Sequence, residues 1–256
     1  MSILFSVGSI KHTSIEEQII FAKEAGFDGI DYLQQFQDIF VIPRHILALT
    51  KKHKIRIKAV HIPLPLVLFT PFFLQQRVIE SLKHFPHMEL FNIHLSSLRN
   101  PFQRNIQNIE NFFHLAKKHR IKISCESNSN EYLIPDYYPK ETYDPKTFAA
   151  FCKQHNIPMT VDVSHIASWK ENIVDFFQKN AANISLFHLS DMTHRNHHQP
   201  FGKGNLPLKE LFKEMKRMKY KGMIVFEIFH FPKHNNKQEI LADIKKSLSM
   251  FKKYAI

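Results

Sequence analysis

The phrase KKHKI at residues 51–55 returns in this chain as KKHRI at residues 117–121 and as KQHNI at residues 153–157. Each copy follows a segment with helical periodicity and precedes a short apolar run typical of a strand. Basic residues at that place complement the negative end of a helix dipole, so each phrase indicates a helix end. A repeated unit of helix, basic residues and strand predicts an alternating β/α chain.

Apolar runs on both sides of these phrases predict eight strands, near residues 3–7, 28–33, 55–61, 89–95, 121–127, 158–163, 184–190 and 222–229. Helical patterns fill the intervals, near residues 14–25, 43–53, 73–85, 104–119, 145–155, 171–180, 207–219 and 237–253. This alternation predicts an α/β fold of the (β/α)8 TIM barrel type, with residues 1–256 as a single domain. A doubly wound open sheet is the alternative, which no GxGxxG or P-loop motif supports.

The composition favours a globular protein of a reducing compartment. With 44% hydrophobic residues, the 256-residue chain can bury a large core. Its two cysteines, Cys125 and Cys152, form no disulfide framework or thiolate metal pattern. The first residues, MSILFSVGSIKH, lack the features of a signal peptide, and prolines interrupt the most apolar segment. We therefore expect a cytoplasmic protein without a membrane association.

The net charge of +12 raises the alternative of a nucleic-acid partner. In a TIM barrel, catalytic groups lie at the carboxyl ends of the strands, whereas helix ends lead into the opposite face. The three basic phrases therefore belong to the face away from the expected site, where a solvated basic surface needs no partner. Nucleic acid remains the less favoured partner.

Acidic or histidine residues end four of the predicted strands. The runs are ISCE ending at Glu126, MTVD at Asp162, SLFH at His188 and MIVFE at Glu227. Carboxylates at the ends of buried strands need a neutralising partner, and the barrel brings strand ends together. The pattern predicts a divalent-metal site of Mn, Zn, Co or Mg, holding one ion, with two or three as alternatives. Further ligands are predicted among the nearby histidines His61, His94, His165 and His198.

These residues resemble the xylose isomerase-like superfamily over essentially the whole chain. The similarity rests on Glu126, Glu227, the pairs Asp162-x-x-His165 and His188-x-x-Asp191, and the stretch HHQPFGKGN at 197–205. That family includes sugar phosphate isomerases, sugar epimerases, inosose enzymes and endonuclease IV. The resemblance implies a TIM barrel whose metal ion is held by Glu126, Asp162, His188 and Glu227. In its epimerase branch, His165 and an arginine after the seventh strand, here Arg195, bind substrate oxygens.

The predicted chemistry is the isomerisation or epimerisation of a carbohydrate, as a free sugar, a sugar phosphate or an inosose. Moving a proton between carbons requires a base, and the enediolate that develops requires a Lewis acid such as a metal ion. Glu126 and Glu227 are the predicted acid/base pair, while Asp162 and His188 mainly fix the ion.

Two other functions stay open. Endonuclease IV uses histidines where His61, His94 and His198 stand, and it assembles three zinc ions to cleave abasic DNA. Asn196 departs from that branch, which has an aspartate there, and an amide is a weak zinc ligand. The third hypothesis is a member that binds a metal or ligand without catalysis.

Several other residues are candidates for substrate recognition. Arg195 and Lys203, beside Gly202 and Gly204, can receive a phosphate or carboxylate, or Lys203 is simply solvated. Trp169 packs against a sugar face or within the core. The tyrosine-rich segment 128–144 is either an active-site lid or a packed loop. The apolar segment 63–73 roofs the pocket or, as we slightly prefer, forms a homodimer interface.

Overall fold

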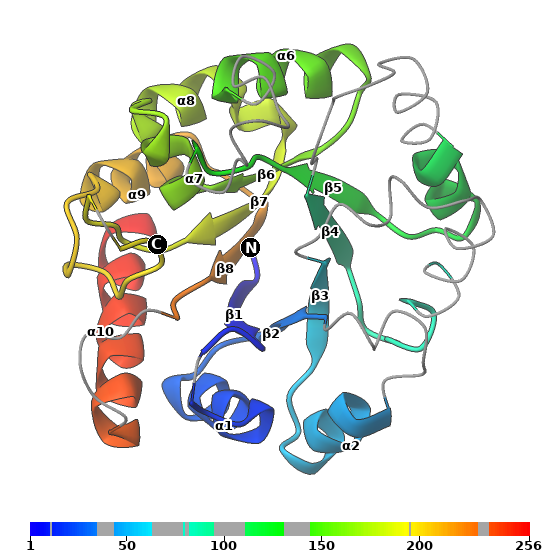
Figure 1. Cartoon of the computed structure of the whole chain (residues 1–256), viewed down its shortest axis with the longest axis vertical. Helices are drawn as coiled ribbons and strands as arrows, with labels where there is room; N and C mark the ends of the chain where they lie inside the picture. Colours follow the sequence, from blue (N-terminus) through cyan, green and yellow to red (C-terminus); the bar gives the residue numbers. More distant parts are fainter. Residues whose placement is uncertain are drawn as a thin grey trace.

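Eight parallel strands close into one barrel in the computed structural model (Figure 1). The structure describes residues 1–10, 12–34, 44–62, 79, 82–94, 111–130, 144–194, 196–229 and 236–256. The strands are β1 (Ile3–Val7), β2 (Gly29–Leu33), β3 (Ile57–Ile62), β4 (Leu90–His94), β5 (Ile123–Glu126), β6 (Met159–Asp162), β7 (Ile184–Leu189) and β8 (Met223–Phe226). Because β8 pairs with β1, the barrel is closed, and the prediction of a (β/α)8 TIM barrel is confirmed.

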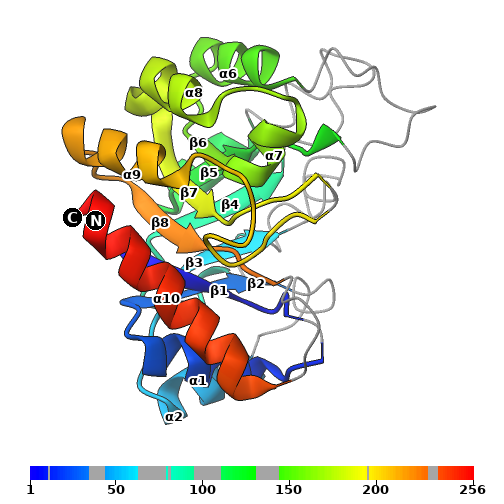
Figure 2. The same ribbon diagram turned by 90° about the vertical axis from the view of Figure 1, so that its left-hand side faces the viewer.

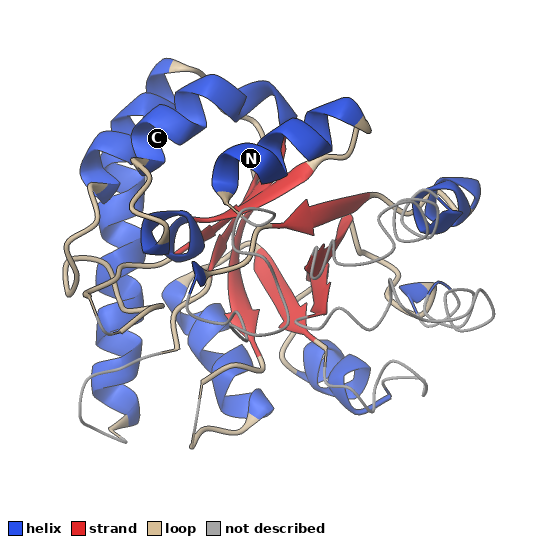
Figure 3. Cartoon of the chain, turned by 45° about the horizontal axis from the view of Figure 1, so that its top comes forward, coloured by secondary structure: helices blue, strands red, loops and turns tan. Residues whose placement is uncertain are grey.

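Helices surround the strands on the outside of the barrel (Figure 3). They are α1 (Ile15–Ala25), α2 (Arg44–Lys52), α6 (Pro145–Gln154), α7 (Val163–Ser168), α8 (Ile173–Asn180), α9 (Leu208–Arg217) and α10 (Lys237–Ala255), with a short 3-10 turn, η4 (Ala181–Asn183). Residues 111–118 are also helical. Most of the buried apolar side chains lie between these helices and the strands, so the main core is this outer layer.

The repeated basic phrase at residues 51–55, 117–121 and 153–157 ends a helix in each of its copies. Lys54, Arg120 and Asn156 occupy the same place in its three copies, and all have a positive φ, of 52°, 59° and 53°. The next residue in each copy donates its backbone N–H to a carbonyl five residues back, at 3.1, 2.9 and 2.8 Å. This is the Schellman ending, in which a left-handed residue lets the chain leave the helix. The prediction that the phrases mark helix ends is confirmed.

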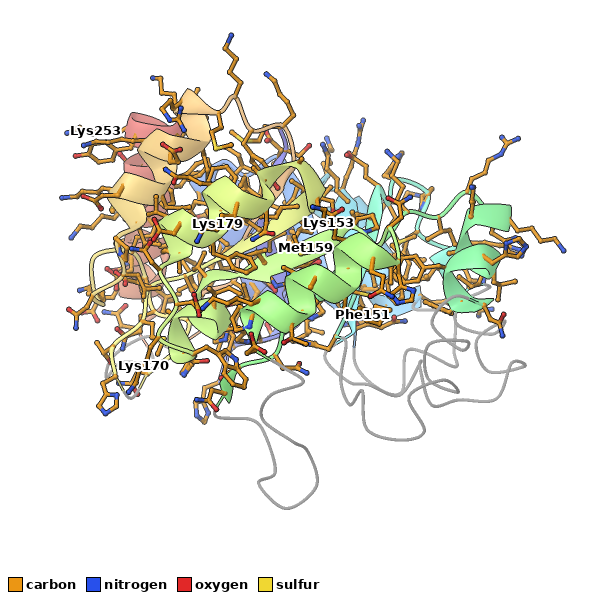
Figure 4. All side chains as sticks on the ribbon, turned by 90° about the horizontal axis from the view of Figure 1, so that it is seen from above. Phe151, Lys153, Met159, Lys170, Lys179 and Lys253 are labelled. Carbon is orange, nitrogen blue, oxygen red and sulfur yellow. The ribbon has the colours of Figure 1, made fainter. Side chains whose placement is uncertain are left out.

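Basic residues in the last turns of the helices project from the outside of the barrel. Figure 4 labels three exposed lysines at such places, Lys153, Lys179 and Lys253. The strand arrows in Figure 2 point toward the loop that follows β7, at the carboxyl end of the barrel. Helix ends lead into the opposite face, so these basic last turns lie away from the strand ends.

The inside of the barrel changes from apolar to polar along its axis. At the amino end, an apolar cluster fills it, made of Leu4, Ala59, Leu90, Leu186, Met223 and Val225. Next to that cluster, five strand residues carry polar side chains without solvent exposure, namely Ser6, Asp31, Asn92, Ser124 and Thr160. TIM barrel interiors usually consist of branched apolar residues. The polar middle therefore indicates that this part of the barrel supports chemistry at its carboxyl end.

Two elements differ from the sequence prediction. The eighth strand was expected to reach residue 229 but ends at Phe226, and Glu227 follows it directly. The short helix α7 was not predicted, because its residues continue the apolar run of β6. Its first turn carries His165, which consequently lies beyond the strand rather than at its end.

Some predicted features lie outside the described residues. They are Arg195, the segment 63–73, residues 131–143 of the tyrosine-rich segment, most of the predicted helix 73–85, and residues 104–110 of the predicted helix 104–119. Among the helices that the structure does describe, none is both long enough and apolar enough to cross a membrane.

Candidate metal centre

Four strand ends bring their polar side chains to one point. One ligand atom from each of Glu126, Asp162, His188 and Glu227 lies within 4.8 Å of the other three, and all four residues are buried. Glu126 and Asp162 are the last residues of β5 and β6, His188 lies in β7, and Glu227 follows β8. The structure thus brings together the four residues that the sequence predicted.

Glu126 is held by contacts on both carboxylate oxygens. The side-chain amide of Asn92 donates to Oε2, and His61 Nε2 lies 3.2 Å from the same oxygen. His188 Nδ1 lies 3.2 Å from Oε1. Because Asn92 belongs to β4 and its Oδ1 accepts from Ser124 Oγ at 3.4 Å, the polar middle of the barrel positions this glutamate.

The two carboxylate oxygens of Asp162 have different partners. Its Oδ1 accepts from Ser164 N at 2.7 Å, Ser164 Oγ at 2.7 Å and His165 N at 2.9 Å, and so caps the start of α7. Its Oδ2 is buried and makes no hydrogen bond within the described residues. The capping contacts fix the carboxylate with one oxygen directed to the group, which suits a cation ligand.

His188 lies between the two glutamates. Its Nδ1 is 2.9 Å from Glu227 Oε2 and 3.2 Å from Glu126 Oε1. The backbone N–H of Glu227 donates to Leu189 O at 3.0 Å, which continues the pairing with β7 beyond the end of β8. This pairing holds Glu227 next to the strand that carries His188.

Burial and neighbouring charges shift the pKa values of Glu126 and Glu227 in opposite directions. Burial raises the pKa of Glu126, but the facing histidines, His188 first among them, hold that pKa well below its usual range. Burial raises the pKa of Glu227 to about 7, because His188 offsets only part of the effect. Burial lowers the pKa of His188, but the two glutamates outweigh it and raise that pKa well above its usual value.

The donor set fits a divalent cation. Three carboxylates meet one imidazole in a place without solvent, and such an excess of negative charge is costly unless a cation balances it. Mixed oxygen and imidazole ligands suit Mn, Zn, Co or Mg. Asp162 Oδ2 is buried and has no hydrogen bond to the described residues, so this oxygen is available to a cation.

Four more histidines extend the cluster of possible ligands. Ligand atoms of His61, His94 and Glu126 lie within 4.8 Å of one another, as do those of Asp162, His165 and His198. The predicted additional ligands therefore border the four-residue group and share two of its three carboxylates, Glu126 and Asp162. Burial lowers the pKa of His61, His94 and His198, which favours the neutral, metal-binding form of these rings.

A sequence profile identifies the family. The profile described as the xylose isomerase-like TIM barrel matches residues 19–254, nearly the whole chain. The chain belongs to the xylose isomerase-like TIM barrel family. Among curated proteins, no significant match is found.

Several solved structures share the fold at low sequence identity. The D-allulose 3-epimerase from Methylomonas sp. in complex with D-allulose has a TM-score of 0.73 and 15% identity, over 99% of this chain and 98% of that chain. An L-ribulose 3-epimerase has a TM-score of 0.74 and 14% identity, over 99% and 94%. An AP endonuclease, family 2, from Brucella melitensis has a TM-score of 0.73 and 15% identity, over 99% of both chains. At these identities the comparison shows the fold alone.

The described residues that were predicted to bind substrate lie in three different surroundings. His165 lies at the metal group, where its Nδ1 is 2.8 Å from Ser127 O. Trp169 donates from Nε1 to Asn128 O at 2.9 Å and ties the loop after β5 to the end of α7. Lys203 lies 3.7 Å from Asp243 of α10, so a protein carboxylate faces this cation.

The loop after β7 is organised by Asp191. Its oxygens accept from the backbone N–H groups of Met192 at 2.9 Å, Gly202 at 2.8 Å and Leu206 at 3.1 Å. A bridge between Asp191 and Gln199 closes the loop and positions His198, whose φ is 55°. A non-glycine residue in this strained region often marks a functional place. In this member of the xylose isomerase-like family, Asp191 therefore shapes the site instead of joining the four-residue group.

Two residues of the site were missed by the sequence analysis. Asn92, two residues before His94, holds Glu126, and Asp31 lies buried in β2 near His61 and His188. Burial raises the pKa of Asp31 to about 6. Both residues are inward positions of alternating strands, so the period-two pattern of each strand was the available signal.

Proposed function

We propose that this protein is a divalent-metal-dependent isomerase or epimerase of a sugar, a sugar phosphate or an inosose. The observation that carries the proposal is the buried convergence of Glu126, Asp162, His188 and Glu227. Membership of the xylose isomerase-like family and the fold shared with sugar 3-epimerases support it.

The reaction needs a proton to leave one carbon and return to it, or to its neighbour, on the required face. A bound divalent ion supplies Lewis-acid stabilisation for the negative charge of the enediolate. Glu126 and Glu227 flank His188 from β5 and from the end of β8, so one takes the proton and the other returns it. Asn92 and His188 hold these carboxylates in place.

The histidines of the rim would hold the substrate. His165 is fixed by Ser127 O, and His94 Nδ1 lies 3.0 Å from Asn128 Oδ1. The centroids of the His94 and His165 rings lie 5.8 Å apart. Each ring also has a nitrogen close to a carboxylate oxygen of Glu126. Such fixed polar groups orient the hydroxyls of a carbohydrate. We also propose roles in substrate binding for Trp169, Lys203 and Arg195.

The test is a turnover assay on a panel of ketoses, sugar phosphates and inososes with Mn, Zn, Co or Mg. Removing the general base should cost at least about 100-fold, so Glu126→Gln should lose turnover by that factor or more. Glu214→Gln is the matched control, because Glu214 pairs with Arg217 near the end of α9, at the face opposite the strand ends, and should leave turnover unchanged. Unchanged turnover in Glu126→Gln would reject the assigned role.

A second candidate is cleavage of abasic DNA, favoured by the two additional histidine groups that share Glu126 and Asp162. These groups offer ligands for further ions, as a three-metal nuclease needs. Asn196 is exposed in the structure, whereas His198 is buried. Incision of a duplex with one abasic site, together with three ions per chain, would establish the nuclease and reject the isomerase.

The proposed location is the cytoplasm. Cys125 and Cys152 are both buried and unbridged, as expected for a protein of a reducing compartment. Export of the protein by its native cell, measured by fractionation, would contradict this proposal.

A further inference from the structure

Asp31 is a buried carboxylate that makes no hydrogen bond of ordinary geometry to the part of the chain that the structure describes. It lies in β2, in register with Ser6 of β1 and Ala59 of β3, and it has no solvent exposure. Within the described residues, neither of its oxygens nor Ser6 Oγ makes a hydrogen bond of ordinary geometry, although Ser6 is close enough to lower the pKa of Asp31 slightly. Isolating a carboxylate in the interior of a barrel is costly, so an ionic or hydrogen-bonding role has to compensate for it.

The group that faces Asp31 is a pair of histidines. One carboxylate oxygen of Asp31 and one ring nitrogen each from His61 and His188 lie within 4.8 Å of one another. The rings of His61 and His188 are in contact, with centroids 4.9 Å apart. The carboxylate of Asp31 therefore lies next to both rings.

The two ring nitrogens of His188 have different surroundings. Its Nδ1 faces Glu126 and Glu227 and so belongs to the proposed metal group. Its Nε2 is buried and makes no hydrogen bond to any residue that the structure describes. When Nδ1 gives its lone pair to a cation, Nε2 must carry the ring proton, and that N–H needs an acceptor.

We propose that Asp31 is the positioning residue of the metal centre, accepting the Nε2–H of His188 so that Nδ1 faces the cation. This inference rests on the proposed metal site. Carboxylates behind metal-binding histidines fix the tautomer and the ring orientation in this way. A second cation between Asp31 and His188 is the less favourable occupant, because His188 would then have to lose both ring protons.

Such a role has a signature that a purely structural residue lacks. Replacing Asp31 by Asn removes an uncompensated buried charge, so the metal-free protein should become more stable. The same change should weaken metal binding by about 10- to 100-fold. Metal-free stability and metal affinity should therefore move in opposite directions.

The experiment measures Mn²⁺ affinity by titration and the melting temperature in EDTA for the wild type, Asp31→Asn and Asp31→Leu. Thr50→Val is the matched control, because Thr50 is buried in the last turn of α2 and its hydroxyl donates to Leu47 O at 3.1 Å, outside every group of possible ligands. It should lose stability and keep its Mn²⁺ affinity. In the Zn²⁺-loaded wild type, long-range ¹H–¹⁵N spectra, assigned with His188→Asn, should show His188 protonated at Nε2.

The outcomes separate this inference from the metal site itself. Wild-type protein that binds neither Mn²⁺ nor Zn²⁺ would reject both. Wild-type binding with unchanged affinity in Asp31→Asn would reject the role of Asp31 alone. Loss of one of two bound ions would overturn it in favour of a second cation site. If the variants do not fold, a His188 ring without a proton at Nε2 in the wild type still overturns it.

Discussion

Asp162 caps the helix α7 with one oxygen and offers the other oxygen to the proposed cation. Two substitutions that both remove its charge can separate these roles. Asp162→Asn keeps an oxygen in the place of Oδ1, where the carboxylate now accepts from Ser164 N, Ser164 Oγ and His165 N. Asp162→Ala removes that acceptor. Because both variants are neutral, the loss of buried charge is common to them, and their difference isolates the helix cap.

The size of that difference follows from the three donors. Losing an N-cap costs about 1 kcal/mol, and each buried donor left without a partner adds about 1 to 3 kcal/mol. Local relaxation recovers part of this, so we expect Asp162→Ala to be about 3 kcal/mol less stable than Asp162→Asn. For a chain of this size, 1 kcal/mol shifts the melting temperature by about 2 to 4 °C, which gives a difference of roughly 6 to 12 °C.

The assay is thermal unfolding followed by circular dichroism, in EDTA and with Mn²⁺. In EDTA, Asp162→Ala should melt below Asp162→Asn by the stated margin. The wild type should gain about 2.7 kcal/mol at an ion concentration 100 times the dissociation constant, and both variants should lose this gain. Equal melting of the variants in EDTA would refute the capping argument. A full Mn²⁺ gain in Asp162→Asn would refute Asp162 as a ligand.

Three further predictions concern the helix ends, the loop after β7 and the ion. Lys54→Gly, Arg120→Gly and Lys219→Gly should each stabilise the protein by about 0.5 to 1 kcal/mol in urea unfolding, because these residues have a φ of 52°, 59° and 51°. The control Lys51→Gly, inside α2, should destabilise it by about 1 kcal/mol, and stabilisation there would contradict the explanation. Gly204→Ala should lower the melting temperature, because a Cβ would collide with the Met192 backbone and the Asp191 carboxylate; an unchanged value would show that the loop adapts. Incubation with EDTA should abolish turnover and Mn²⁺ should restore it, whereas turnover that persists in metal-free protein would reject the metal-dependent reaction.

The sequence predicted the barrel and its four-residue group because both depend on local rules. A buried run that ends in Glu126 or Asp162 indicates where a strand stops, and parallel closure then brings such ends together. The helix α7 was missed because Asp162 serves as the last residue of a strand and the cap of a helix at once. The ion pair between Lys203 and Asp243 joins residues that are far apart in the sequence. Periodicity does not indicate which distant carboxylate pairs with a lysine, so this contact could not be predicted.

The roles of Asn92 and Asp31 required the strand register. Alternation alone places both on the inner face, but it does not show that Asn92 reaches Glu126 on the next strand or that Asp31 approaches His188 on β7. Register comes from the packing of the whole barrel, so supporting residues are harder to predict than the ligands that they hold.

The charge of this barrel links the number of ions to the reaction. Asp31, Glu126, Asp162 and Glu227 are four buried carboxylates around one region. When all four are ionised, one divalent ion leaves two negative charges in excess, before any histidine is protonated. That environment disfavours a phosphodiester at the ion and accommodates the carbonyl and hydroxyl groups of a sugar. Three divalent ions would reverse the sign and attract the DNA backbone. Metal content per chain therefore distinguishes the two enzymatic functions on electrostatic grounds, independently of any substrate panel.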